Sequence, residues 1–333
     1  MIPVKKAAVA EESEKSMKKK LKEKKEKTSK RTLQRMKMHW QIYLLIIPAI
    51  AWYILFAYVP MSGLLLAFKS YKAKLGILGS PWTGLSNFKM VFRDPAFMNA
   101  VFRTFQINIL KLLITFPFPI LLAVLFNEVR LNKSKKALQT IFTFPHFLSW
   151  IIVAGIMQNL LSSSGVVNSL LNQLFGVKVN FLANQKLFQP MLYATEIWKS
   201  AGYSAIIYMS AIAGIDQEQY EAAEIDGASR FQRIIHITIP SILPTISIMF
   251  ILATGNLMSG GFDQIFNLAN AVTKPVAETI DVYIYRITFQ QTPSFGFSTA
   301  VSLFRSVVNL SLLLISNFVS KKLTGTNLIG SSS

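Results

Sequence analysis

Six long apolar segments dominate this sequence of 333 residues and limit the folds open to it. A transmembrane helix needs about 20 predominantly apolar residues. Six segments meet that requirement: 44–68, 105–126, 138–161, 190–215, 234–258 and 297–318. Prolines inside them would break helices in water, but neighbouring helices of a bundle can satisfy the freed backbone groups. Several small residues could permit close helix approach, namely Gly63, Ala211, Ala213 and Gly214. The segments predict an all-α integral membrane protein with six transmembrane helices.

The composition supports a membrane class. Hydrophobic residues make up 52% of the chain and charged residues only 15%, whereas soluble domains carry about a quarter charged residues. The chain has no cysteine, which excludes disulfides, thiolate metal sites and cysteine nucleophiles. Its three histidines, His39, His146 and His236, are scattered along the sequence. We therefore expect no metal site.

The formal charge of +19 is concentrated in a basic tail, residues 1–40, which holds 14 of the 35 Lys and Arg residues. This distribution does not favour a nucleic-acid partner. The tail has too few apolar residues to build a core. Two interpretations stay open, a solvated tail or a strip that lies on anionic membrane lipid. Its charged region is too long for a signal peptide, and no small-residue cleavage site follows the apolar run.

The distribution of Lys and Arg also predicts the orientation of the chain. Cytoplasmic loops of membrane proteins carry an excess of these residues. With the N-terminus inside, the cytoplasmic segments hold 22 of them and the outer segments 9. We therefore expect a transmembrane domain over 41–320, with the basic tail, the loop 216–233 and a C-terminal tail, 321–333, in the cytoplasm.

The loop 216–233 has acidic residues first and arginines last, an order that complements a helix dipole. Gly227 is expected to divide it into two short helices, and Asp226 is expected to pair with Arg230 at i,i+4 spacing. By itself this pattern indicates a helical surface loop, and its alanines leave room for another protein.

The stretch "EAAEIDGASRFQRIIHITIPSILP" resembles the EAA loop of permease subunits in ATP-binding-cassette (ABC) importers. The matching positions are Glu221, Ala222, Ala223, Asp226, Gly227, Ala228 and Pro240. The segments "GSPWTGLSNF", "FPHFLSWIIVAGI", "IWKSAGYSAIIYMSAIAGID" and "KKLTGT" resemble the branch that imports complex oligosaccharides and polysaccharide fragments in Gram-positive bacteria. Some members of that branch serve uronate-rich glycans. The resemblance covers nearly the whole chain after residue 40.

The resemblance implies a six-helix type I ABC importer permease fold in the cell membrane of a Gram-positive bacterium. In the family the two EAA helices seat in a groove of an ATPase subunit, with Glu221 as the charged anchor and Gly227 as the turn. The implied partners are a second permease subunit in a heterodimer, two ATPase subunits and an extracellular solute-binding lipoprotein. The sequence has no G-x-x-x-x-G-K-[ST] phosphate loop. We therefore expect ATP and Mg²⁺ on the ATPase subunits, and no cofactor or catalytic residue in this translocating chain.

Four ionisable residues lie within the predicted spans, in one layer of the outer half: Lys111, Glu196, Lys199 and Arg305. Charge inside a membrane is a functional hypothesis by default. Glu196 and Lys199 are expected to pair at i,i+3 spacing, which would leave Lys111 and Arg305 as a net positive layer. Such a layer could receive an acidic sugar, but the long side chains could equally snorkel outward or pair with a second permease. The aromatic residues Trp198 and Tyr203 could stack on sugar rings or simply pack.

The leading prediction is therefore an oligosaccharide permease, for an acidic or a neutral glycan. An intramembrane enzyme would need paired aspartates, a Ser/His dyad or HExxH inside the membrane, and the spans hold none of these. A sensor or scaffold would usually carry a soluble output domain, and beyond the spans we expect only tails and short loops. The outer segment 259–296 is either a docking surface for the lipoprotein or a packed loop.

Overall fold

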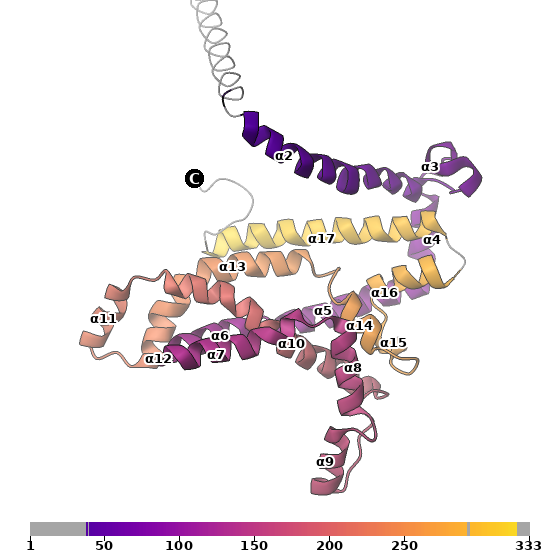
Figure 1. Ribbon diagram of the computed structural model, residues 1–333. Coiled ribbons are helices and arrows are strands. Elements are labelled where there is room, and N and C mark those ends of the chain that lie inside the picture. The colour runs from indigo at the N-terminus through magenta and orange to yellow at the C-terminus, as the bar shows by residue number, and fades with distance from the viewer. Residues whose placement is uncertain (1–37, 39, 292–293, 325–333) are drawn as a thin grey trace, which may run out of the picture. The chain divides into compact units, whose positions relative to one another are not determined.

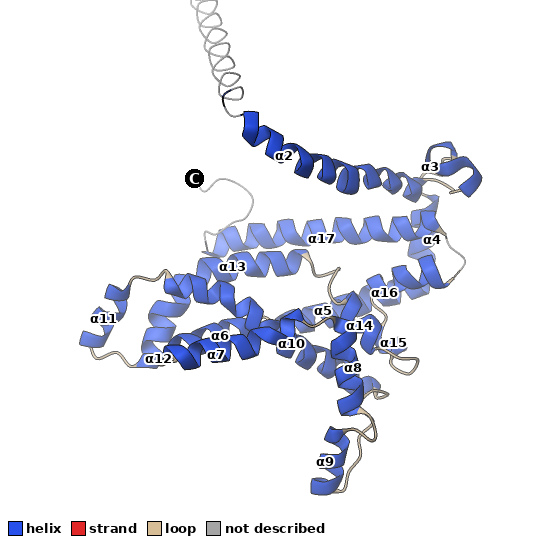
Figure 2. Ribbon diagram, viewed as in Figure 1, coloured by secondary structure: helices blue, strands red, loops and turns tan. Residues whose placement is uncertain are grey.

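A computed structural model describes residues 38, 40–291 and 294–324. Most of the predicted tails, 1–40 and 321–333, therefore lies outside the described residues. The described residues form helices joined by loops (Figure 2). Their only strand-like pairing is one isolated bridge between Lys69 and Trp82.

The chain divides into two units, Met1–Leu64 and Leu65–Ser333. In the first unit, α2 (Trp40–Tyr53) continues into a π-helix, η1 (Ile54–Tyr58), and then into the start of the 3₁₀ helix η2 (Val59–Phe68). The large apolar side chains described between Leu44 and Leu64 are exposed. Apolar surface of this extent requires lipid or another protein around it.

The second unit holds the remaining helices (Figure 1). Its long helices are α5 (Pro95–Thr115), α6 (Pro117–Glu128), α7 (Asn132–Thr143), α8 (Trp150–Leu161), α9 (Val166–Phe175), α10 (Gln185–Ala213), α13 (Ile239–Gly255) and α17 (Phe295–Thr324). Its short elements are η3 (Ala73–Leu75), α3 (Gly76–Gly79), α4 (Ser86–Arg93), η4 (Phe144–Phe147), α11 (Gln217–Ile225), α12 (Arg230–Arg233), η5 (Ile234–Thr238), α14 (Phe262–Leu268), α15 (Lys274–Ala277), α16 (Ile280–Tyr285) and η6 (Arg286–Gln290).

Among the described residues, five helical segments are long and apolar enough to cross a membrane: Leu44–Phe68, Pro95–Glu128, Trp150–Phe175, Arg230–Gly255 and Phe295–Lys322. The fourth predicted span, 190–215, corresponds to α10. With 29 residues this helix is also long enough to cross, but it is less apolar than the other five. The predicted outer segment 259–296 forms the short helices α14 to α16 and η6 rather than a simple loop.

The third predicted span, 138–161, is not one continuous helix. Helix α7 ends at Thr143, a 3₁₀ turn follows over Phe144–Phe147, and α8 begins at Trp150. Pro145 has no N–H to continue the helical hydrogen bonds. The hydroxyl of Ser149 then caps the new helix by accepting the N–H of Ile152.

Two of the π-helices end two residues before a proline: η1 before Pro60 and η5 before Pro240. A proline ring inside a helix clashes with the carbonyl four residues earlier. Those carbonyls belong to Phe56 and His236, which lie inside the two π segments. The wider turn accommodates each proline without ending the helix, so α13 continues directly from η5.

Three clusters of buried side chains hold the second unit together. The first joins α4, α5, α16 and α17, and the second joins α5, α8, α10 and α14. The third joins α6, α10 and α13 at the end of the bundle from which α11 extends.

The closest helix approaches occur at glycines other than those predicted. A Cβ atom on Gly202 of α10 would lie 2.1 Å from the carbonyl oxygen of Phe142, and one on Gly255 would lie 2.7 Å from the Leu313 side chain. By contrast, nothing lies within 4 Å at Gly63, and at Gly214 the nearest atom is 3.5 Å away. Gly63 and Gly214 are therefore not packing glycines, whereas Ala211 packs against the buried cluster of α6, α10 and α13.

Candidate functional site

In the predicted loop 216–233, α11 is a separate short helix, and α12 is the first turn of the continuous helical segment Arg230–Gly255. The carboxylate of Asp216 caps α11 by accepting the N–H of Glu218 at 3.1 Å. Helix α11 ends before Gly227, which has a φ of 78°, a left-handed conformation that favours glycine. Ser229 and Gln232 then form a capping box that starts α12. The predicted break at Gly227 is confirmed.

Both short helices present side chains outward. Glu221, Ala222, Asp226 and Gly227 are exposed, and Ala223 and Ala228 are half-buried. Sequence reasoning missed two large apolar side chains beside the turn: Ile225 is 87% exposed and Phe231 is 71% exposed. An apolar residue on each side of the glycine in a charged loop was the signal available. Exposed side chains of this size, next to acidic ones, suit a protein partner.

The expected pair between Asp226 and Arg230 does not form, because Gly227 and the Ser229 cap place the two residues outside a common helix. Instead Arg233 donates to the carboxylate of Glu224 at 2.7 Å. A polar cavity of about 460 Å³ lies beneath the loop. Its wall includes Glu221, Glu224, Arg230, Arg233, Tyr220 and Gln217 from the loop, and Asn127, Glu128 and Arg130 from the end of α6 and the residues after it.

The intramembrane charges pair differently from the sequence expectation. Glu196 bonds to Lys111 at 2.6 Å, not to Lys199. Lys111 also donates to the side-chain oxygen of Gln264 at 2.9 Å, and Ser200 donates to Glu196 at 2.8 Å. Gln264 is buried and donates to the carbonyl of Leu192 at 2.7 Å. One network thus joins α5, α10 and α14.

Lys199 takes a separate environment. Its ammonium donates to the carbonyl of His146 at 2.7 Å and lies 5.5 Å from the centre of the Trp150 ring. That carbonyl belongs to the 3₁₀ turn η4, so Lys199 fixes the turn between α7 and α8. The ring of His146 stacks on Tyr203, with 3.9 Å between centroids. Lys199 and Tyr203 therefore both pack against this turn.

Arg305 of α17 forms an ion pair with Asp281 of α16. Burial raises the pKa of the Asp281 carboxyl, and the neighbouring guanidinium opposes that rise. Because both Lys111 and Arg305 have carboxylate partners, the expected positive layer of unpaired cations is wrong. The sequence expectation failed since Asp281 lies outside the predicted spans.

Two further contacts link the same region. Arg286 pairs with Glu278 at 2.5 Å, and the hydroxyl of Tyr283 donates to Asp94 at 2.5 Å. Burial, together with the Asp94 carboxylate, raises the pKa of Tyr283, so this hydroxyl keeps its proton. Since Asp94 also caps α5, the Tyr283 contact attaches α16 to the start of that helix.

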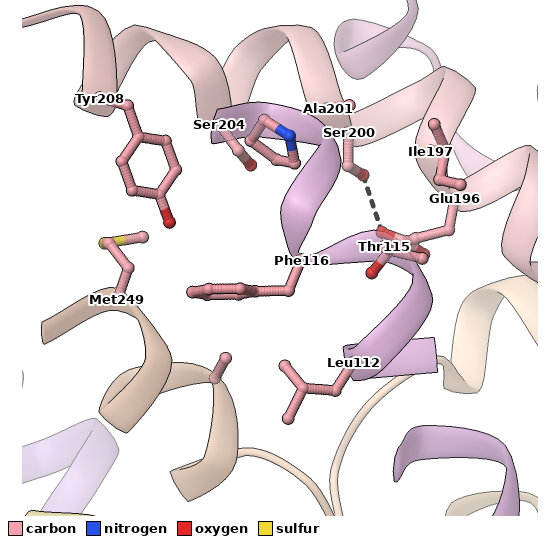
Figure 3. Close-up of a pocket in the computed structure, with 12 residues that line it drawn as sticks. Leu112, Thr115, Phe116, Glu196, Ile197, Ser200, Ala201, Ser204, Tyr208 and Met249 are labelled. Atoms are coloured by element: carbon pink, nitrogen blue, oxygen red, sulfur yellow. Dashed lines mark hydrogen bonds between the residues drawn. The ribbon is translucent and has the colours of Figure 1, made fainter. Parts of the chain in front are cut away.

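A cavity of about 190 Å³ lies where α5, α6, α10 and α13 meet (Figure 3). Glu196 lines it, with the hydroxyls of Ser200, Ser204, Tyr208 and Thr115 and the apolar side chains of Leu112, Phe116 and Met249. The other predicted lining residues, Lys111, Lys199, Arg305, Trp198 and Tyr203, are not part of this wall. Trp198 lines a separate, apolar cavity of about 390 Å³ together with Met157 and Met191. In the described part of the chain no three His, Asp or Glu side chains form a metal-binding group.

Comparison with known proteins places these features in a family. The sequence model of the family described as binding-protein-dependent transport system inner membrane component matches residues 29–325 of this chain. The chain belongs to this family. In Bacillus subtilis (strain 168), the polygalacturonan/rhamnogalacturonan transport system permease protein YteP is 42% identical over 294 residues, which are 88% of this chain and 91% of the relative. Protein LplB of the same organism is 41% identical over 282 residues, 84% of this chain and 88% of the relative.

A solved structure shares the fold of this permease. A chain of a bacterial ABC transporter involved in the import of the acidic polysaccharide alginate superposes with a TM-score of 0.81 and 38% identity, over 88% of this chain and 99% of that one. The predicted family and the helical ABC importer permease fold are confirmed. The relatives are transport permeases, in agreement with a translocating subunit rather than an enzyme.

Proposed function

We propose that this permease subunit carries acidic, uronate-containing oligosaccharides in an ATP-driven importer. The similarity to two proteins named for acidic polysaccharides supports this most strongly: YteP for polygalacturonan and rhamnogalacturonan, and the solved alginate transporter. The alternative is a neutral oligosaccharide. It rests on weaker similarity, such as 28% identity over 226 residues to the lactose transport system permease protein LacF of Rhizobium radiobacter.

Reconstitution of the complex in liposomes with its binding protein tests the substrate. Uronate oligosaccharides should stimulate ATP hydrolysis at least tenfold more than neutral oligosaccharides of equal length. The neutral set should share the sugar configuration and linkage of the uronate set, so that the carboxylate distinguishes the two ligand sets. Equal or greater stimulation by the neutral set would exclude the acidic substrate.

The loop 216–233 is proposed as the contact with an ATPase subunit that binds ATP and Mg²⁺. Glu221 supplies a charged anchor and Gly227 the turn. The exposed side chains of Ile225 and Phe231 supply apolar contacts to the ATPase subunit. Because buried aromatic and aliphatic anchors dominate binding energy at interfaces, Phe231→Ser and Ile225→Ser should each reduce co-purification of the ATPase at least tenfold.

Glu221→Gln should lower uptake more than ATP hydrolysis, because the charged anchor is lost while the apolar contacts remain. Normal uptake by this variant would refute the anchor role. Failure of the unmodified chain to co-purify with any ATPase would refute the coupling role of the loop itself.

The proposed assembly contains a second permease in a heterodimer, two ATPase subunits and an extracellular solute-binding lipoprotein, in a Gram-positive cell membrane with both termini cytoplasmic. The alginate transporter has been solved with an alginate pentasaccharide-bound periplasmic protein, which supports a binding-protein partner. The helices α14 to α16 are the proposed docking surface for that protein.

The residues of the proposed substrate route are Glu196, Lys111, Lys199, Arg305, Trp198 and Tyr203.

A further inference from the structure

Two side-chain contacts attach α11 to the residues directly before α13. The hydroxyls of Tyr220 and Thr238 lie 2.9 Å apart, and the carboxylate of Glu224 lies 2.7 Å from the Arg233 guanidinium. On α11, Tyr220 and Glu224 are four residues apart and therefore share a face. Both contacts bypass the turn at Gly227.

The π-helix η5 explains how both contacts form together. Arg233 and Thr238 are five residues apart, so in an α-helix of 3.6 residues per turn they would point about 140° apart. In a π-helix, where hydrogen bonds join residues five apart, they come close to a common face. The Thr238 hydroxyl lies 3.5 Å from the carbonyl of Arg233. The π turn thus presents both partners to α11.

The two contacts differ in strength. Thr238 is only 2% exposed, and the ring of Tyr220 packs against the buried cluster shared by α6, α10 and α13. Glu224, in contrast, has a side chain that is 72% exposed, and exposed ion pairs contribute little. The hydroxyl contact therefore carries most of the attachment.

The contact connects α11 to a helix that runs through the bundle. Tyr220 and Thr238 both line the polar cavity of about 460 Å³, together with residues from the end of α6. Toward α13, the loop is joined through Thr238 to a continuous helix. Helix α13 in turn packs closely on α17, where Gly255 meets Leu313 (Figure 1). The hydroxyl contact thus connects α11 to α13 and, through α13, to α17.

We propose that Tyr220 and Thr238 are positioning residues that lock α11 to the start of α13, so that movement of the loop becomes movement of the bundle. This rests on the proposed coupling of the loop to an ATPase. Without the hydroxyl contact, α11 can move with the ATPase while α13 stays behind. ATP hydrolysis then continues without an equal amount of transport.

The test uses the reconstituted complex and measures substrate imported per ATP hydrolysed. Tyr220→Phe and Thr238→Val each remove one hydroxyl and preserve the side-chain shape. A hydrogen bond of ordinary net strength predicts a loss of about three- to tenfold in the transport-to-ATP ratio for each variant. The double variant should lose no more than either single variant, because both remove the same contact.

Thr140→Val is the matched control, since the Thr140 hydroxyl bonds only its own helix, to the carbonyl of Lys136 at 3.0 Å. Its transport-to-ATP ratio should stay normal. Normal transport-to-ATP ratios for both Tyr220→Phe and Thr238→Val, or additive losses in the double variant, would overturn the proposal.

Assembly is measured in parallel by co-purification of the ATPase. If the two conservative variants failed to assemble while Thr140→Val assembled, the hydroxyl contact would serve folding and the proposal would be wrong. If the unmodified chain bound no ATPase, the proposed coupling function itself would fail. The two failures are therefore distinguishable.

Discussion

Lys111 and Glu196 form an ion pair whose side chains are only 16% and 21% exposed. Removing one partner of such a pair leaves an uncompensated charge. We predict that Lys111→Met or Glu196→Gln destabilises the complex by about 3 kcal/mol, measured as a lower thermal unfolding midpoint in detergent. The exchange Lys111→Glu with Glu196→Lys should recover most of that loss.

Arg103 on the same helix provides the control for this prediction, because its guanidinium bonds only the nearby Gln106 side chain, at 3.3 Å. Arg103→Met should change the midpoint much less. If Lys111→Met were as mild as Arg103→Met, the pair would not stabilise the bundle. In that case Lys111 would be free for an acidic substrate after all.

At the scale of elements, Gly202 sets how closely α10 approaches the end of α7. A methyl group there would meet the carbonyl oxygen of Phe142 at 2.1 Å, and a backbone atom cannot move aside as a side-chain end can. Overpacking of this kind costs about 1–3 kcal/mol. Gly202→Ala should therefore lower the unfolding midpoint, while Gly214→Ala at the end of the same helix should not. Equal midpoints for the two variants would contradict this packing.

The elements also show which sequence signals suffice. Gly227 and the Ser229 cap act locally, so the division of the loop into two helices could be predicted. The break at Phe144–Phe147 could not be obtained from apolar length, because hydropathy counts composition and ignores where Pro145 interrupts hydrogen bonding. The packing glycines Gly202 and Gly255 were missed for another reason: the partner helix of a glycine is unknown before the fold is.

At the scale of the whole molecule, the candidate site contains residues that a local motif identifies and residues that only long-range packing brings together. The residues of the loop 216–233 are contiguous, so a motif could identify them. Lys111 and Glu196 lie 85 positions apart, and Arg305 pairs with Asp281 on a different helix. Sequence spacing favoured Glu196 with Lys199, since only neighbours within one helix can be paired from spacing. Long-range pairing required the packed bundle.

The orientation of the whole chain gives the last prediction. The chain has no native cysteine, so any single introduced cysteine is a unique label site. Ser134 and Val177 are both exposed, and the excess of Lys and Arg assigns their segments, 127–137 and 162–189, to opposite sides of the membrane. In intact cells a membrane-impermeant maleimide should label Val177→Cys and leave Ser134→Cys unlabelled. Permeabilised cells should give labelling of both, and the unmodified chain none in either state. Labelling of Ser134→Cys alone in intact cells would show that the orientation is the reverse of the predicted one. It would place the loop 216–233 outside, where no ATPase could drive it.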